Sequence, residues 1–314
     1  MTSMFEQEAQ ADAHAAADPS EGFNAGEMIL SHVTNSSPDH PLFHLPTVFG
    51  IDLSVTKHVF MLWFVAAFVF VALTWLVRRH ISKGRLVPSG AMNVLELTVE
   101  WIRDAVVRPN LGDKWTRTWT PLLLTLFLFI LAANLIGLVP IFDVLGLVDH
   151  YVLQTSDDSF LKNLLHGGAT STGNYNVTAG LAVVTFFAII AAGTMAHGFV
   201  KHFLNLVPKG LPWPLYGLLI PLEVMSMFVR PFALTMRLAA NMTGGHIAIL
   251  AILSFVFIFA DMFGAAAGTA IGFGFAVPLA VAISGLEIVV VLVQAYVFTL
   301  LSAVFIGMAI HVHH

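Results

Sequence analysis

The chain has no cysteine and few charged residues, and both shortages narrow the kinds of protein it can be. Without cysteine it has no disulfides, no thiolate metal sites and no cysteine nucleophile. Charged residues make up only 11% of the 314, and the basic ones are scattered, which excludes nucleic acid as a partner. Hydrophobic residues make up 57%, and the mean hydropathy is +0.83. This composition is typical of an integral membrane protein.

Lysine and arginine are missing altogether from residues 1–56, which are rich in Ala, Asp, Glu, His, Ser and Pro. This segment matches neither a secretory signal peptide nor an arginine-rich transit peptide. We interpret it as a polar, partly disordered N-terminal tail. Its histidines lack the regular spacing of metal ligands. We expect solvated side chains rather than a metal site there and in the terminal HVHH (311–314).

Apolar runs long enough to cross about 30 Å of hydrocarbon follow the tail. Three of ordinary length are predicted at residues 59–77, 121–139 and 178–200. Between the first two, residues 89–107 have a single apolar stripe with charged residues elsewhere. That pattern is too polar to span and predicts an amphipathic helix in the interface plane. Residues 141–177 are polar and predict an outer loop.

The last third of the chain (213–312) holds two overlong apolar segments, at 213–260 and 270–310. The second would measure about 60 Å at 1.5 Å per residue, twice the hydrocarbon thickness. We predict two strongly tilted helices, the second bent at Pro278 or Gly285. They pair as an antiparallel hairpin through the Gly- and Ala-rich residues 261–274, because small side chains allow close approach.

The predicted fold class is therefore an all-α integral membrane protein. It has about five transmembrane helices and one interfacial helix, and its last two helices form a long, tilted hairpin. Residues 78–117 and 201–209 hold ten lysines and arginines, whereas 1–56 and 141–177 hold one. By the positive-inside rule, the N-terminus lies outside and the C-terminus in the cytoplasm. We expect a cell inner membrane, with the mitochondrial inner membrane as the alternative.

The apolar segment 221–249 carries polar side chains that lipid would exclude. They are Glu223, Arg230, Arg237, Asn241 and His246. An arginine at the centre of a membrane helix, as Arg237 is, costs about 2.5 to 3.5 kcal/mol on insertion scales. At about 100° per residue, Glu223, Arg230 and Asn241 lie within roughly 40° of Arg237, whereas His246 points to the opposite side. Fixed positive charge and a titratable group thus occupy different faces.

The final helix adds Glu287 and Gln294, which are seven residues apart and share a face. Glu287 and His246 suit a proton relay, since both groups bind and release protons. Arg237 stays protonated, so it attracts an anion and blocks a proton wire. This combination suits two half-channels: a carboxylate on a moving partner loses a proton on one side, passes Arg237 as an anion and regains a proton on the other.

These residues resemble subunit a of the F-type ATP synthase, the stator of its membrane motor. The resemblance covers a membrane domain at residues 57–314. It rests on RLAANMTGGH (237–246), NLIGLVP (134–140), Glu223 upstream, and Glu287 with Gln294. It implies that Arg237 faces the carboxylates of a c-ring. It also implies that His246 and Glu287 form the outer half-channel pair, that Gln294 lies across from Arg237, and that Glu223 lies in the inner half-channel.

The resemblance further implies a subunit that couples proton flow to rotation and ATP synthesis, without a catalytic site, metal or cofactor of its own. The expected partners are the c-ring, peripheral-stalk subunit b, membrane lipid and the translocated protons. Asn134 and Arg230 are secondary candidates. Asn134 either bridges helices or carries protons, and Arg230 either snorkels to head groups or joins the site. The tail and the loop 143–177 are longer than in compact members.

Two other functions are considered. A secondary transporter would use Arg237 to bind an anionic substrate, but that class predicts internal repeats, which the sequence does not show. A haem protein would use His197, His202 and His246 as ligands. His197 and His202 lie near the inner edge of the membrane, away from the depth of His246.

Overall fold

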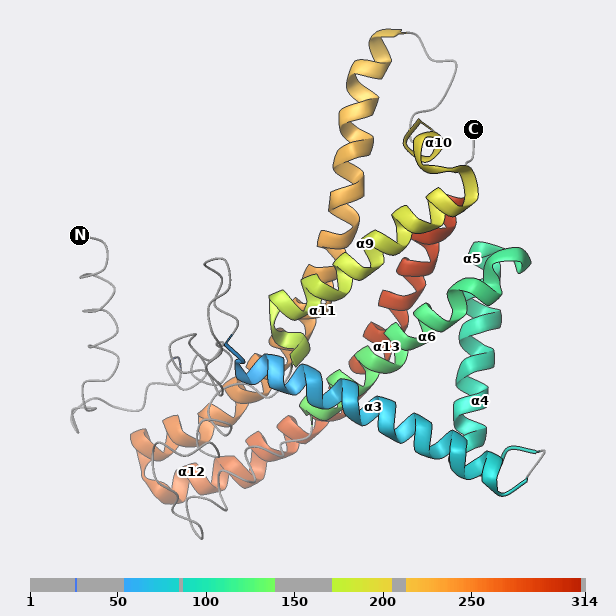
Figure 1. The fold of residues 1–314 in the computed structure, drawn as a ribbon. Coiled ribbons are helices and arrows are strands. Elements are labelled where there is room, and N and C mark those ends of the chain that lie inside the picture. The colour runs from blue at the N-terminus through green and yellow to red at the C-terminus, as the bar shows by residue number, and fades with distance from the viewer. Residues whose placement is uncertain (1–25, 27–53, 85–86, 139–170, 205–212, 312–314) are drawn as a thin grey trace. The chain divides into compact units, whose positions relative to one another are not determined.

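The computed structural model describes residue 26 and residues 54–84, 87–138, 171–204 and 213–311. The regular structure of these residues is helical, as predicted (Figure 1). Nearly all of the predicted tail (1–56), most of the outer loop (141–177) and the last residues of the terminal HVHH lie outside them, so those predictions stay untested.

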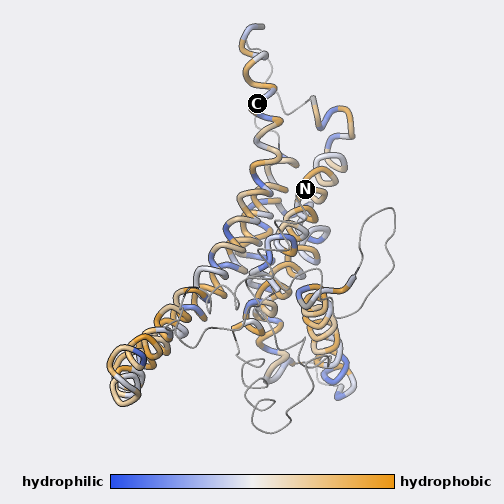
Figure 2. Tube along the Cα trace, turned by 90° about the vertical axis from the view of Figure 1, so that its left-hand side faces the viewer, coloured by the Kyte–Doolittle hydropathy of each residue, from blue (hydrophilic) through white to orange (hydrophobic). Residues whose placement is uncertain are grey.

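Five helical segments are long and apolar enough to cross a membrane, which confirms the predicted class. Apolar residues dominate them along their length (Figure 2). They are α3 (Lys57–Ser82), α6 (Asp113–Leu138), α9 (Tyr175–His197), α11 (Trp213–Phe263) and the run Ala265–Ile310. The last comprises α12 (Ala265–Ile271), a π-helical turn η4 (Gly272–Ala276) and α13 (Val277–Ile310).

The observed helices differ from the predicted spans at their ends. α6 begins at Asp113 rather than at Pro121, which lies inside the helix. Hydropathy detects only the apolar part, whereas helical hydrogen bonding continues where charged side chains reach water. α9 ends at His197 rather than at residue 200, because Gly198 adopts a φ of 86° and interrupts the helix before α10 (Phe199–Leu204).

The predicted interfacial helix at 89–107 is α4 (Ala91–Trp101), which continues as a π-helical turn η1 (Ile102–Val107) and as α5 (Arg108–Leu111). Ile102 and Val106 on its apolar stripe are fully buried. Gly112, with a φ of 76°, then turns the chain directly into α6, so that α4, η1 and α5 form a helical hairpin with it (Figure 1).

The described residues fall into two compact units, Ile247–Ile283 and the remainder. In the larger unit, the C-terminal half of α13 lies in the core. Trp101 of α4 stacks on Tyr296 at 5.1 Å between ring centroids, and the hydroxyls of Ser302 and Thr185 lie 3.3 Å apart. A Cβ on Gly307 would collide with the carbonyl oxygen of Asn110 in α5, so only glycine allows this approach.

The smaller unit is a helical hairpin. α11 ends at Phe263, Gly264 turns the chain with a φ of 91°, and α12 returns. Gly268 lies against Ala260 and Gly272 against Val256, a register that only antiparallel helices produce. The predicted hairpin through 261–274 therefore forms, and glycine permits the close contact.

The predicted bend in the last long helix has a counterpart just before Pro278. Proline has no N–H, and its ring clashes with the carbonyl four residues earlier. The π-helical turn η4 lies directly before this position and ends two residues before Pro278. Gly285, the other predicted bend, lies inside uninterrupted α13.

Candidate functional site

A carboxylate and an imidazole meet between α11 and α13. Nδ1 of His246 lies 3.2 Å from Oε1 of Glu287, and the two form an ion pair when the imidazole is protonated. Glu287 is only 4% exposed, so its carboxylate depends on such a partner. Its second oxygen, Oε2, is buried and has no hydrogen-bond partner among the described residues. That oxygen is therefore available to a proton or a water molecule.

Gly245 makes room for this pair. A Cβ on Gly245 would lie 2.5 Å from Oε1 and 2.9 Å from Cδ of Glu287, whereas a Cβ on the adjacent Gly244 would meet nothing within 4 Å. Sequence reasoning did not assign Gly245 a role. The sequence did carry a signal: a glycine inside a helix costs about 1 kcal/mol relative to alanine, so its presence there indicates a role in packing or function.

Four of the predicted polar residues line one small pocket. They are Asn134 from α6, Asn241 from α11, and Glu287 and Gln294 from α13. The pocket volume of about 10 Å³ is room for one water molecule. Three helices thus place hydrogen-bonding side chains around the same small pocket as Glu287, whose other walls are apolar.

Asn134 also connects secondary-structure elements. It is 1% exposed, and its Oδ1 accepts a hydrogen bond of 2.5 Å from the hydroxyl of Thr172 in the short 3₁₀ helix η3 (Ser171–Gly173). The hydroxyl of Thr243 donates to the carbonyl of Gly173 at 3.3 Å. Asn134 therefore bridges helices and lines the pocket as well. Sequence reasoning missed Thr172, which is distant in the chain and belongs to no recognised pattern.

Arg237 lies outside the core of its own unit. Its neighbours Leu234 and Leu238 are 2% and 1% exposed, whereas Arg237 is exposed. It makes no hydrogen bond or ion pair with any residue that the structure describes. A guanidinium within a membrane is costly unless it is paired or hydrated, and no counterion for Arg237 is found among the described residues.

Arg230 differs from Arg237 because it has partners within the chain. Its Nη2 lies 3.6 Å from Oε1 of Glu223, and its guanidinium lies 5.6 Å from the ring centroid of Phe305. Glu223 and Arg230 are seven residues apart, so they share a face of α11. This pairing favours an internal role for Arg230 over snorkelling.

The histidines considered as haem ligands have other contacts. Nε2 of His197 donates to the carbonyl oxygen of Ile310 at 2.8 Å, which satisfies a carbonyl at the end of α13. His202 is buried against Gly193 of α9, and burial, together with the nearby His197, lowers the pKa of its imidazole. No group of three potential ligands is close enough to hold a metal ion among the described residues.

The packing of α10 on α9 is expected to weaken below about pH 6.5. The lowered pKa keeps folded His202 neutral, whereas in the unfolded segment it takes up a proton near its ordinary pKa of about 6.5. Its contribution is therefore present above that pH and lost as the pH falls. Hydrogen exchange of the α10 amides, corrected for intrinsic rates, should increase at about pH 5.5. A His202→Phe variant should lose this dependence; equal protection of the wild type at both pH values would contradict it.

The helices and the contact between His246 and Glu287 define a multi-pass membrane protein with a protonatable site between its spans. Comparison with known proteins then names the family. A family model described as ATP synthase A chain matches residues 59–307. The chain belongs to the ATP synthase subunit a family, the proton-translocating membrane subunit of Fo.

Curated relatives agree with this assignment over most of their length. "ATP synthase subunit a 2" of Chlorobium luteolum is 41% identical, with 95% of this chain and 79% of the relative covered. The protein of that name from Prosthecochloris aestuarii is 38% identical, covering 91% and 80%. "ATP synthase subunit a" of Anaeromyxobacter dehalogenans is 37% identical, covering 92% and 71%.

Proposed function

We propose that this chain is the proton-conducting stator of an F-type ATP synthase. Two offset half-channels protonate and deprotonate the carboxylates of a c-ring, and Arg237 separates them. The observation that carries the proposal is the contrast between the two intramembrane arginines: Arg230 has an internal carboxylate, whereas exposed Arg237 has none among the described residues. As the ring rotates, each c-ring carboxylate in turn supplies the counterion of Arg237.

The outer half-channel is assigned to His246 and Glu287, supported by their 3.2 Å contact and by the small pocket that Glu287 lines with Asn134, Asn241 and Gln294. Asn241 and Gln294 hold water or the travelling proton next to the free oxygen of Glu287. Glu223, paired with Arg230, is assigned to the inner half-channel. Each proton that crosses yields about 2.3 kcal/mol per 100 mV of membrane potential.

The proposed partners are the c-ring, peripheral-stalk subunit b and membrane lipid. The proposed location is a cell inner membrane, with the N-terminus outside and the C-terminus in the cytoplasm. The distribution of lysine and arginine supports this orientation. The end of α3 on the side assigned to the cytoplasm carries Arg78 and Arg79, and Lys83 follows it; all three side chains are exposed.

A Gly245→Ala variant tests the assigned relay. The added methyl group would occupy the place of the Glu287 carboxylate and separate it from His246. Passive proton uptake by Fo reconstituted in liposomes is expected to fall about tenfold or more, as proton transfer requires hydrogen-bond contact.

Gly244→Ala is the matched control. It changes the same dipeptide in the same helix, but its methyl group meets no atom within 4 Å in the chain. Assembly of both variants into Fo is checked by the yield of purified complex. If the two assembled variants conduct protons equally well, the relay is wrongly placed.

A further inference from the structure

A second polar site lies at the membrane surface, away from the proposed proton path. An open cleft of about 490 Å³ separates the interfacial helix from the start of α6. Its lining includes the three arginines Arg103, Arg108 and Arg117 together with the apolar residues Val99, Pro121 and Leu124. The volume falls within the range of small-molecule sites. The cleft combines cationic and apolar walls.

Two of the three arginines are held in place by aspartates. Asp104 accepts hydrogen bonds of 3.0 and 2.8 Å from Nε and Nη2 of Arg103, and its Oδ1 lies 2.9 Å from Nη1 of Arg108. Nε of Arg108 in turn lies 2.9 Å from Oδ1 of Asp113. The Arg103 guanidinium holds the pKa of Asp104 below its usual range, so the aspartate stays ionised. The arginines are thus preorganised.

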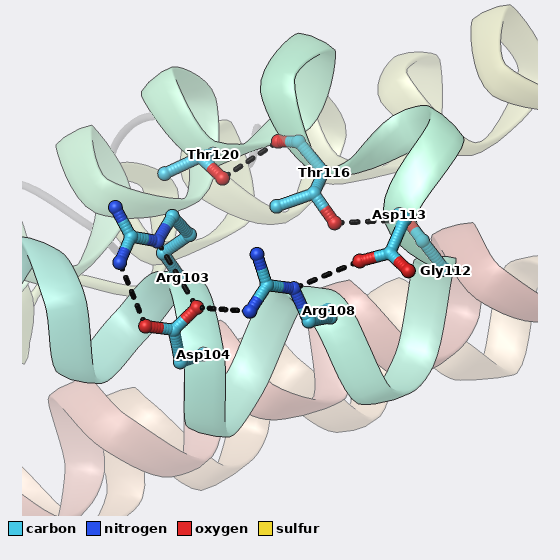
Figure 3. Close-up of polar contacts among 7 residues, drawn as sticks. All are labelled: Arg103, Asp104, Arg108, Gly112, Asp113, Thr116 and Thr120. Carbon is cyan, nitrogen blue, oxygen red and sulfur yellow. Dashed lines mark hydrogen bonds and ion pairs between the residues drawn. The ribbon is translucent and has the colours of Figure 1, made fainter.

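This network leaves some guanidinium N–H donors without a hydrogen-bond acceptor and one positive charge without a counterion among the described residues. Nη1 of Arg103 and Nη2 of Arg108 have no partner among the described residues, and both point toward the side on which α6 carries Thr116 and Thr120 (Figure 3). Exposed Arg117 has no hydrogen bond or ion pair within the described part of the chain. Three arginines against two aspartates leave one positive charge, which a singly charged phosphodiester would match.

The depth of the cleft distinguishes a lipid from a free anion. From Asp113 to Leu124 it follows α6 for about 16 Å at 1.5 Å per residue. One layer of head groups is only about 5 to 8 Å thick. The cleft therefore continues from the level of lipid phosphates into the hydrocarbon, where Pro121 and Leu124 offer an apolar wall.

We propose that this cleft binds one anionic phospholipid. Its phosphodiester lies among Arg103, Arg108 and Arg117, and an acyl chain runs along Val99, Pro121 and Leu124. The bound lipid fills the space between the interfacial helix and α6, and so fixes the helical hairpin that holds α13 through Asn110 and Gly307.

The test uses the purified membrane complex that contains this chain and a phosphatidylglycerol with a photoreactive group on its acyl chain. Cross-links should map to peptides of α4–α6, and excess unlabelled phosphatidylglycerol should compete whereas phosphatidylcholine should not. Arg117→Gln, which leaves the aspartate network intact, should reduce labelling about fivefold, the effect of one basic residue near a membrane surface.

Lys114→Gln is the control, since Lys114 lies near Arg117 in sequence but stacks on Trp115 and does not line the cleft. It should leave labelling unchanged. Equal labelling of wild type and Arg117→Gln, or equal competition by phosphatidylcholine, would overturn the proposal. Displacement by inorganic phosphate alone would show a free-anion site instead. A photoreactive residue at position 124 that captures another subunit would show a protein contact.

Discussion

Replacing Arg237 with alanine is expected to abolish coupled ATP synthesis and to open a passive proton leak through the assembled complex. A guanidinium at about 4 Å from a carboxylate contributes about 4 kcal/mol at an effective dielectric constant of about 20. Without it, the ionised c-ring carboxylate is disfavoured about a thousandfold at the stator. The barrier between the half-channels disappears as well, because Arg237 is the fixed cation that excludes a proton from that position.

The measurement is ATP synthesis and passive proton flux in liposomes that contain the whole enzyme. Arg230→Ala serves as the matched control, since it removes a second intramembrane arginine from the same face of α11. The loss of Arg230 leaves Glu223 unpaired, but Arg237 remains as the counterion of the c-ring carboxylate. Synthesis should therefore decrease without a proton leak. Normal coupled synthesis by Arg237→Ala would refute the assigned role.

Removing either member of the buried pair is expected to reduce proton-driven synthesis by about 10²- to 10⁴-fold, the usual contribution of one positioned acid or base. His246→Ala removes the partner of the Glu287 Oε1, and Glu287→Gln removes the carboxylate that pairs with the imidazole. Exchanging the two residues, His246→Glu with Glu287→His, restores a carboxylate and an imidazole at the same place. The double variant should therefore retain much more activity than either single variant.

ATP synthesis driven by an imposed proton gradient measures all three variants, with passive proton flux as a second readout. A double variant no better than the single ones would contradict a shared path. Gln294→Ala offers a milder comparison, because Gln294 lines the pocket but makes no hydrogen bond to His246 or Glu287. Its effect should lie between those of the wild type and Glu287→Gln.

The polar pattern within 221–249 was sufficient to single out candidate site residues, because lipid excludes polar groups that have no function. Spacing alone also placed Arg237 and His246 on different faces of one helix. The helix boundaries were less accurate: hydropathy placed the start of α6 at Pro121, whereas the helix begins at Asp113. Hydropathy reports contact with lipid and not the hydrogen bonds that define a helix.

Contacts between distant segments were not predictable from spacing. The bond from Thr172 to Asn134, the space that Gly245 leaves for Glu287, and the arginine cleft beside α6 each depend on how helices are rotated against one another. Periodicity shows which residues share one face of a helix. It does not show which other helix packs against that face, or at what depth in the membrane the face lies.

By itself, the sequence determined an all-α membrane protein with five spans and an intramembrane arginine, because hydrophobic length and the cost of burying charge are properties of local sequence. Only the tertiary structure gave the 3.2 Å contact of His246 with Glu287, the pocket that Asn134 lines with Glu287, and the absence of a partner for Arg237 among the described residues while Arg230 has one. The reason is physical: pairing depends on the crossing and rotation of helices, which side-chain packing sets over the whole chain.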